Sequence, residues 1–466
     1  MVSTAARNSG DVVTDSVTII NSGLLEGQIA ADTATSLFSF ANSGSITADG
    51  HFYAVALSTT GYADARGRDG ESFTFANSGS IQGATDLTIE STAVTITNSG
   101  EMVDEPDDGN RYLAHRLAEL TVYHETALDG MTTFNNSGTI RTSDYAAAGV
   151  SVDTYAGYLT DGTGTASSTV TVNNSGSILA SGGNVVMLDV LLGPSHEWFG
   201  LSGETMQVNL STGLSVDLHA TGETRLTINN LAGGEIRADA APLRVNNWLD
   251  YPQPQAAAGQ GIVARADSIA IYNDGVISGA TGGSLLSPVT GQPFPTIVSF
   301  RNFSYWQAEE LEFVLGGAID TMESTDVIVN SATGVINGSI ALRQGDDRLT
   351  NLGTINGSVF MGSGDDRLET LLGNWDSHVT GIMDGGSGDD TLIFLGDQGG
   401  RLQDMTLAAP VSFEHVLLGG TGVVTSDGAM STVGLAAGAD ITLAQGSIFA
   451  ATGALRSRMA RTAPSP

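Results

Sequence analysis

The sequence predicts an all-β solenoid, a three-sided parallel β-helix with about 19–21 residues per coil. Three observations predict it: the tripeptide Asn-Ser-Gly returns through the first half of the chain, a longer phrase ending in Gly-Asp-Asp is repeated near the C-terminal end, and the runs between these corners alternate apolar and polar residues. Alternation indicates strands with one buried face, and Asn and Gly tolerate the left-handed backbone of a tight corner. A unit of three short strands cannot bury its inner face alone, so the units must stack.

The clearest repeat lies within residues 330–394. Ile-Asn-Gly-Ser followed by Gly-Asp-Asp-Arg-Leu occurs at 336–349 and again at 355–368, and a third Gly-Asp-Asp stands at 388–390. The first glycines of these corners, Gly345, Gly364 and Gly388, are 19 and 24 residues apart. We expect them to lie directly above one another along one edge of the solenoid.

The spacing of the Asn-Ser-Gly marker suggests how many coils the chain forms. The marker and its looser forms begin at Asn8, Asn21, Asn42, Asn77, Asn98, Asn136, Asn174, Asn230, Asn273, Asn330 and Asn351. From Asn21 onward the steps fall near one, two or three times a common period of about 19.4 residues, which predicts about 17 coils, some of them unmarked. We expect the marker Asn side chains to stack and to hydrogen-bond to the coils above and below.

Four stretches break the coil pattern and are expected to protrude as loops: residues 101–130, 186–206, 241–260 and 284–316. They contain three of the four Trp residues, and residues 112–120 are the best short helix candidate. The predicted β-helix covers residues 1–394. Less regular coils or a cap follow over 395–455, and residues 456–466 are expected to be a disordered tail.

Composition excludes several classes of function. The chain has 466 residues, with 51 acidic and 18 basic side chains and a formal net charge of −33. Such a field repels phosphates and anionic membranes, so no nucleic-acid partner is expected. The absence of Cys excludes a disulfide scaffold, Cys-ligated zinc and a Cys nucleophile. No apolar run is long enough for a membrane-spanning helix, and the N-terminal residues lack the apolar core of a signal peptide.

Within residues 330–394 the phrase Asn-x-Gly-x-Ile-Asn-Gly-Ser-Val-x-Met-Gly-x-Gly-Asp-Asp-x-Leu resembles the passenger domains of bacterial autotransporters. A more diffuse likeness extends over about residues 8–450. The resemblance implies a right-handed parallel β-helix, exported to the outside of a Gram-negative cell and either released or held at the outer-membrane surface. It implies a cell-surface glycan, a protein ligand or another copy of the chain as partner. The ten-residue alternating strands of an export barrel are not found, so the chain is expected to be the passenger alone or to lack a barrel.

The Gly-Asp-Asp corners are also similar to the calcium-binding nonapeptide Gly-Gly-x-Gly-x-Asp-x-apolar-x of RTX proteins. Residues 385–393 fit all of it, residues 361–369 all but the first Gly, and residues 342–350 only three positions. The resemblance implies a calcium site formed by Asp347, Gly364, Asp366, Gly386, Gly388 and Asp390. Such glycines bend a loop so that carbonyls and carboxylates converge on a hard cation. Plain acidic corners without a metal are the alternative.

No nucleophile elbow, P-loop or His-Glu-x-x-His motif is present, so no catalytic residue and no enzymatic activity are predicted. A metal site at His115, Glu119 and His124 is disfavoured, because such residues in a polar insertion are usually solvent-exposed. Polysaccharide lyases and glycoside hydrolases also use β-helices, with carboxylates on neighbouring coils as acid and base. Their candidates here are Asp365, Asp366, Asp389 and Asp390.

These four aspartates belong to a repeat, whereas active sites are usually singular. We therefore expect a secreted or surface-displayed adhesin or binding scaffold. A calcium-dependent surface-layer or fibre subunit is the first alternative, and a polysaccharide-cleaving enzyme is the second.

Overall fold

The structure is a computed structural model. It describes residues 16–33, 35–48, 53–59, 72–103, 120–126, 129–142, 148–157, 165–181, 184–190, 204–240, 256–281, 297–304, 307–314, 317–322, 324–372, 379–396, 411–419, 423–426, 440–443 and 448–451. Within these ranges every regular element is a β-strand, and no helix is long and apolar enough to cross a membrane.

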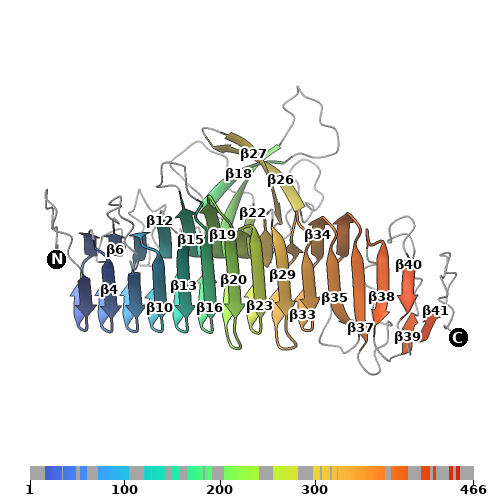
Figure 1. Cartoon of the computed structure of the whole chain (residues 1–466), viewed down its shortest axis with the longest axis horizontal. Helices are drawn as coiled ribbons and strands as arrows, with labels where there is room; N and C mark the ends of the chain where they lie inside the picture. The colour runs from blue at the N-terminus through green and yellow to red at the C-terminus, as the bar shows by residue number, and fades with distance from the viewer. Residues whose placement is uncertain are drawn as a thin grey trace.

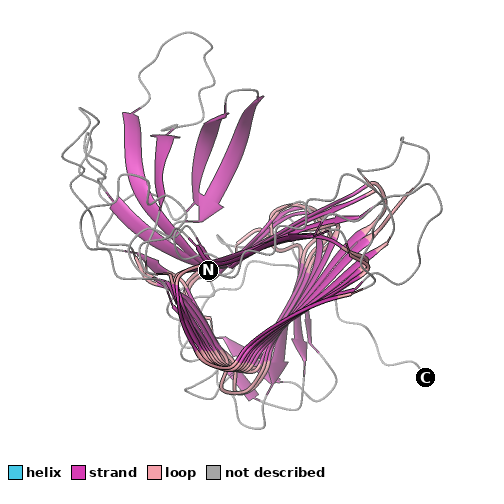
Figure 2. Cartoon of the chain, turned by 90° about the vertical axis from the view of Figure 1, so that its left-hand side faces the viewer, coloured by secondary structure: helices cyan, strands magenta, loops and turns pink. Residues whose placement is uncertain are grey.

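The chain forms a parallel β-helix, in which three long sheets are the faces of a prism-shaped rod (Figures 1 and 2). The chain climbs from one sheet to the next and returns to the first sheet one strand further on, so neighbouring strands are parallel. The predicted fold class is confirmed.

The strand bounds of the three faces follow. The 14-stranded sheet has the order β1 (Val17–Asn21), β4 (Leu37–Asn42), β7 (Ser72–Asn77), β10 (Ala93–Asn98), β13 (Gly130–Asn136), β16 (Ser168–Asn174), β20 (Thr224–Asn230), β23 (Ser268–Asn273), β29 (Thr325–Asn330), β32 (Arg348–Asn351), β35 (Arg367–Leu372), β37 (Thr391–Gly396), β38 (His415–Gly419) and β40 (Asp440–Leu443). The 10-stranded sheet has the order β2 (Leu24–Glu26), β5 (Ser45–Thr47), β8 (Ser80–Gln82), β11 (Glu101–Val103), β14 (Thr139–Thr142), β17 (Ser177–Ala180), β21 (Glu235–Ala238), β24 (Val276–Ser278), β30 (Val335–Asn337) and β33 (Thr354–Asn356). The 13-stranded sheet has the order β3 (Ile29–Thr33), β6 (Tyr53–Thr59), β9 (Ala84–Glu90), β12 (Leu120–Thr126), β15 (Ala148–Ala156), β19 (Glu204–Ala220), β22 (Ala256–Arg265), β28 (Ile319–Thr321), β31 (Ile340–Ala341), β34 (Val359–Ser363) and β36 (Met383–Ser387), with β18 (Asn184–Val190) on β19 and β25 (Ala280–Thr281) on β22.

The count of about 17 coils with unmarked ones between is wrong. Asn42 hydrogen-bonds to Asn77, 35 residues later, and Asn174 to Asn230, 56 residues later, so each of these steps is a single coil. The extra residues belong to the connections between successive strands of a coil. The spacing between successive marker asparagines therefore depends on the length of the insertions, because neighbouring strands pair whatever length of chain connects them.

The interior combines stacked apolar side chains with columns of polar ones. Phe38 stacks on Phe73 and Phe40 on Phe75, with ring centroids 5.1 and 4.8 Å apart, and all four rings are buried. Stacking of like residues on successive coils buries apolar area without leaving gaps, and each such side chain contributes about 1.5–3 kcal/mol.

The longest polar column is the Asn ladder, the stack of marker asparagines that end the first ten strands of the 14-stranded sheet, from β1 to β32. Each amide nitrogen donates to the amide oxygen of the next coil over 2.8–2.9 Å. The ladder runs through Asn21, Asn42, Asn77, Asn98, Asn136, Asn174, Asn230, Asn273, Asn330 and Asn351. The same nitrogens also face backbone carbonyls of the corner, so the buried amides are satisfied within the solenoid. The expected stacking of Asn is confirmed.

Two of the predicted insertions contribute β-structure beside the rod. Strand β18 pairs antiparallel with the first half of β19, and β26 (Ile297–Ser304) forms an antiparallel hairpin with β27 (Gln307–Val314). These strands stand out from the side of the 13-stranded sheet (Figures 1 and 2), and β18 lies against β26. We call β18, β26 and β27 the projecting strands.

The other parts of the predicted insertions are only partly described. Residues 101–103 and 120–126 are regular strands of the rod, and residues 256–260 belong to β22. Residues 104–119, with most of the predicted helix, and Trp198, Trp248 and Trp306 lie outside the described residues. At the C-terminal end β38 and β40 extend the 14-stranded sheet, and β39 (Val423–Ser426) pairs with β41 (Ile448–Ala451). The expected tail, 456–466, is outside the described residues.

Candidate functional site

The Gly-Asp-Asp corners stack in register along one edge of the rod. Gly345, Gly364 and Gly388 have φ angles of 143°, 138° and 149°, which side chains rarely adopt. A methyl group at Gly364 would collide with the carbonyl oxygen of Gly345, and one at Gly388 with that of Gly364. Each glycine therefore permits both the corner and the close approach of the next coil, and the expected vertical register is confirmed.

The second Asp of each corner points into the rod. Asp347, Asp366 and Asp390 are 2%, 1% and 0% exposed. One carboxylate oxygen of each accepts the backbone N–H of the corresponding Asp one coil earlier, over 2.8–2.9 Å. The series begins at Asp326 and ends at Glu414, which accepts the N–H of Asp390. We call Asp326, Asp347, Asp366 and Asp390 the aspartate column.

The aspartate column replaces a column of apolar side chains. Asp326 is directly opposite Ile269, which is itself opposite Leu226. Toward the N-terminus the same inward position is taken by residues such as Phe38 and Phe73. The C-terminal coils thus exchange hydrophobic stacking at this corner for hydrogen bonds between side chain and backbone.

Burial changes the acidity of these groups. Burial, together with neighbouring carboxylates, raises the pKa of Asp347 to about 8 and that of Asp366 to about 7. Burial likewise raises the pKa of Asp326 and of Asp390 to about 6. The hydrogen bonds from backbone N–H groups act in the opposite direction, because they favour the charged form.

The two oxygens of each carboxyl differ in their hydrogen-bond partners. The Oδ1 atoms accept the backbone N–H groups, whereas the buried Oδ2 atoms of Asp347, Asp366 and Asp390 have no hydrogen-bond partner in the structure. An oxygen in this position carries a proton or contacts a cation, because a bare buried carboxylate oxygen is costly.

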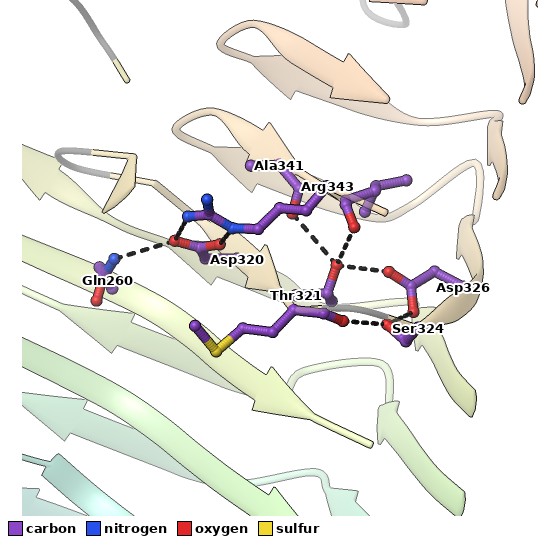
Figure 3. Close-up of polar contacts among 9 residues, drawn as sticks. Gln260, Asp320, Thr321, Ser324, Asp326, Ala341 and Arg343 are labelled. Atoms are coloured by element: carbon purple, nitrogen blue, oxygen red, sulfur yellow. Dashed lines mark hydrogen bonds and ion pairs between the residues drawn. The ribbon is translucent and has the colours of Figure 1, made fainter. Parts of the chain in front are cut away.

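Asp326 lies in a different environment at the start of the column (Figure 3). Its two carboxylate oxygens accept hydrogen bonds from the hydroxyls of Thr321 and Ser324. Beside it, Arg343 forms a two-pronged ion pair with the buried Asp320, at 2.8 and 2.9 Å. Asp326 follows Ser-Thr instead of Gly-Asp, so the corner motif did not identify it as a member of the column. The alternation of buried and exposed residues in its strand could have identified it as an inward-pointing residue.

The aspartate column only partly fits the predicted calcium site. The unpartnered oxygens of Asp347, Asp366 and Asp390 suit a hard cation. They are stacked one per coil, however, and among the described residues no group of three or more His, Cys, Asp and Glu converges as around a metal ion. Gly364, Gly386 and Gly388 shape the corner backbone, and calcium stays a prediction.

The predicted enzymatic candidates separate into buried and exposed residues. Asp365 and Asp389 face solvent in a second, outer series, in which Asp346 Oδ1 accepts the backbone N–H of Asp365 and Asp365 Oδ1 accepts that of Asp389. Asp366 and Asp390 are inside. They therefore do not share one surface. His115 and Glu119 lie outside the described residues, and His124 belongs to β12, opposite Thr154.

A second polar cluster lies on the outer side of the 13-stranded sheet. Asp153 on β15 is directly opposite Asp217 on β19. His219 contacts Asp217 over 3.1 Å and stacks on Tyr155 with ring centroids 4.9 Å apart. Burial and the neighbouring Asp217 raise the pKa of Asp153 to about 6, while His219 acts to lower it. A carboxyl with a raised pKa beside a second carboxyl on the next coil can serve acid–base chemistry. No sequence motif identifies this pair, because its residues belong to distant segments.

The fold and the site define an all-β protein of the parallel β-helix class with acidic corners. A scan against models of protein families, a search of curated proteins and a search of solved structures each found no match.

Proposed function

We propose that this chain is an extracellular binding scaffold displayed by a Gram-negative cell, in which a rigid β-helical rod holds a recognition element clear of its surface. The observation that carries the proposal is the set of projecting strands. They stand out beside the 13-stranded sheet near the middle of the rod (Figure 1), where β18 extends β19 and lies against β26.

The rod itself suits a scaffold. Its stacked coils share one continuous apolar core, and the sequence has no Cys, so the rod is held together by packing between coils and not by disulfides. Loops and hairpins that leave a rigid framework are the usual place for recognition, because their sequence can vary without disturbing the core. A net charge of −33 favours solubility and opposes unspecific binding to anionic surfaces. The partner proposed is a cell-surface glycan or protein.

Two other functions remain proposals. A calcium-dependent surface-layer or fibre subunit would use the aspartate column, whose unpartnered oxygens would bind the cation. Polysaccharide cleavage would use the Asp153–Asp217 pair, which lies on the outside of the rod, in preference to the buried Asp366 and Asp390.

Deletion of the β26–β27 hairpin tests the scaffold proposal. Gly279 and Gly317 are in contact, so a short Gly-Ser link from Thr281 to Gly317 can replace residues 282–316 without disturbing the coil. We expect the circular dichroism spectrum and the Tm of the rod to be retained. Binding of the labelled protein to a glycan array and to intact cells should fall at least tenfold. Equal binding by the intact and shortened proteins would contradict the proposal.

A further inference from the structure

The outer face of the 14-stranded sheet is almost free of charge over nine consecutive coils. From β1 to β29 its outward-pointing side chains include one charged residue, Arg225, which is neutralised by Glu223 at 2.8 Å. We call this the neutral face. Its outward residues are Thr18, Ile20, Leu37, Ser39, Ala41, Ser72, Thr74, Ala76, Ala93, Thr95, Thr97, Met131, Thr133, Asn135, Thr169, Thr171, Asn173, Arg225, Thr227, Asn229, Ser268, Ala270, Tyr272, Thr325, Val327 and Val329.

The same face carries most of the exposed large hydrophobic side chains of the described residues. Ile20, Leu37, Met131, Tyr272 and Val327 are 72%, 46%, 57%, 44% and 37% exposed. Exposed apolar side chains on a contiguous surface without charge indicate an interaction site. Scattered single hydrophobic residues would need no such explanation.

The other two faces are charged, which makes the neutral face distinctive. The outward residues of the 13-stranded sheet include Asp86, Asp153, Asp217 and Arg265, and those of the 10-stranded sheet include Glu26, Glu101, Arg141, Glu235 and Arg237. On the 14-stranded sheet itself charge returns at β32 and β35, with Arg348, Arg367 and Glu369. The neutral face is thus a bounded patch on a chain with a charge of −33.

The neutral face is also preorganised. The amide of Asn173 donates to Asn135 over 2.9 Å, and that of Asn229 donates to Asn173 over 2.8 Å, which forms a second Asn ladder outside the rod. The threonines are β-branched and lie in a column from Thr74 to Thr227, so their side chains have few rotamers to lose on contact. A surface of small, fixed side chains can pack closely against another at little cost in conformational entropy.

We propose that two copies of this chain associate through their neutral faces, packed sheet against sheet around a two-fold axis. The same patch then serves both partners, as a two-fold interface requires. Charge selects this face: contact through any other face would bring the carboxylates of two strongly acidic chains together.

The area agrees with a stable dimer. Nine coils at about 4.8 Å and strands of six residues at about 3.3 Å each give roughly 800 Å² per copy, which is the size of a standard specific interface. The proposal does not depend on the projecting strands, which leave a different sheet, so its failure would leave the binding scaffold untouched.

Paired Arg substitutions test the proposal by sedimentation velocity. Thr74→Arg with Thr95→Arg places two charges on directly paired strands of the neutral face. Thr47→Arg with Gln82→Arg does the same on the 10-stranded sheet and is the matched control, because it changes the net charge equally. The Tm of both variants identifies any loss of folding.

We expect the unmodified chain to dimerise more strongly as NaCl is raised, because salt screens the repulsion between the acidic copies. The neutral-face variant should dissociate with a Kd at least tenfold higher, and the control should dimerise as the unmodified chain does. A chain that stays monomeric at high salt, or two variants that behave alike, would overturn the proposal. So would a monomer that instead adsorbs to crystalline cellulose or chitin through this face.

Discussion

At the scale of single residues, the buried aspartates show how the solenoid tolerates ionisable groups in its interior. Each carboxyl gives one oxygen to a backbone N–H of the preceding coil and keeps the other without a partner at Asp347, Asp366 and Asp390. Burial disfavours the charged form more than the backbone N–H hydrogen bonds favour it, which is why the pKa values of Asp347 and Asp366 are raised. The same side chains that mark the repeat therefore link the stability of the rod to pH.

Replacing Asp366 and Asp390 by Asn should weaken that pH dependence. A carboxyl whose pKa is higher in the folded than in the unfolded chain stabilises the fold fully below about pH 4. That stabilisation is lost as the pH rises through 6 to 7, by up to about 1.4 kcal/mol per pH unit for each group. We expect the Tm of the unmodified chain to fall from pH 5 to pH 8, and that of Asp366→Asn with Asp390→Asn to fall less. An unmodified Tm that rises over this interval would contradict the account.

The same pair of variants tests the predicted calcium. Added calcium should raise the Tm of the unmodified chain most at pH 8, where the cation no longer competes with a proton, and should leave the double variant unchanged. An equal shift in Tm in both proteins would show that calcium acts at a site other than Asp366 and Asp390.

At the scale of one strand and its corner, the Asn ladder explains why a marker tripeptide recurs. Asn136 is 2% exposed, accepts from Asn98 over 2.9 Å and donates to Asn174 over 2.8 Å. An amide is suited to this position because it both donates and accepts, so one residue type can continue the ladder indefinitely. The ladder ends where Asn351 donates to the hydroxyl of Thr370.

Asn136→Ala should destabilise the coils around it. It removes the hydrogen bond that Asn136 accepts from Asn98, and it leaves the buried amide oxygen of Asn174 without the donor amide of Asn136, at about 1–3 kcal/mol for an unsatisfied buried group. The matched control is Asn135→Ala, the next residue along, whose amide lies on the outer face and is only part-buried. We expect a clear loss of stability in urea and faster amide hydrogen exchange in strands β10 and β16 for the first variant alone. Similar behaviour of both variants would show that the inner ladder contributes no more than the outer one.

At this scale the sequence predicted much of the local structure. Alternation identified strands with one buried face, and Asn and Gly identified the corners, because each residue type has a direct physical reason to be there. The glycines at 345, 364 and 388 were correctly placed in one stack. The sequence analysis did not assign the second Asp of each corner to the interior. The available signal was the alternation, because this Asp stands two residues before a buried Leu, Leu349 or Leu368.

At the scale of the whole molecule, the fold class was predictable and the number of coils was not. Pairing between successive strands is fixed by the inward side chains and the ladder, whereas the length of an insertion is unconstrained by either. Asn273 and Asn330 are 57 residues apart and still adjacent in space. For the same reason the neutral face and the Asp153–Asp217 pair were invisible in the sequence, since both are made by residues that only the stacking brings together.

The most direct test of this stacking is an engineered disulfide in a chain that has no native Cys. Ser177 and Glu235 lie directly opposite on neighbouring strands of the 10-stranded sheet, although a long insertion separates them in sequence. Adjacent strands place their Cα atoms about 4.8 Å apart, within reach of a disulfide, whereas a step of two coils exceeds the limit of about 7 Å. Thr139 with Glu235, two coils apart, is the control pair.

The account predicts that Ser177→Cys with Glu235→Cys forms an intramolecular disulfide under mild oxidation, detected by mass spectrometry of the peptides, and that Thr139→Cys with Glu235→Cys does not. Free thiols in the first pair, or crosslinking in the control alone, would contradict the claim that successive marker asparagines belong to adjacent coils.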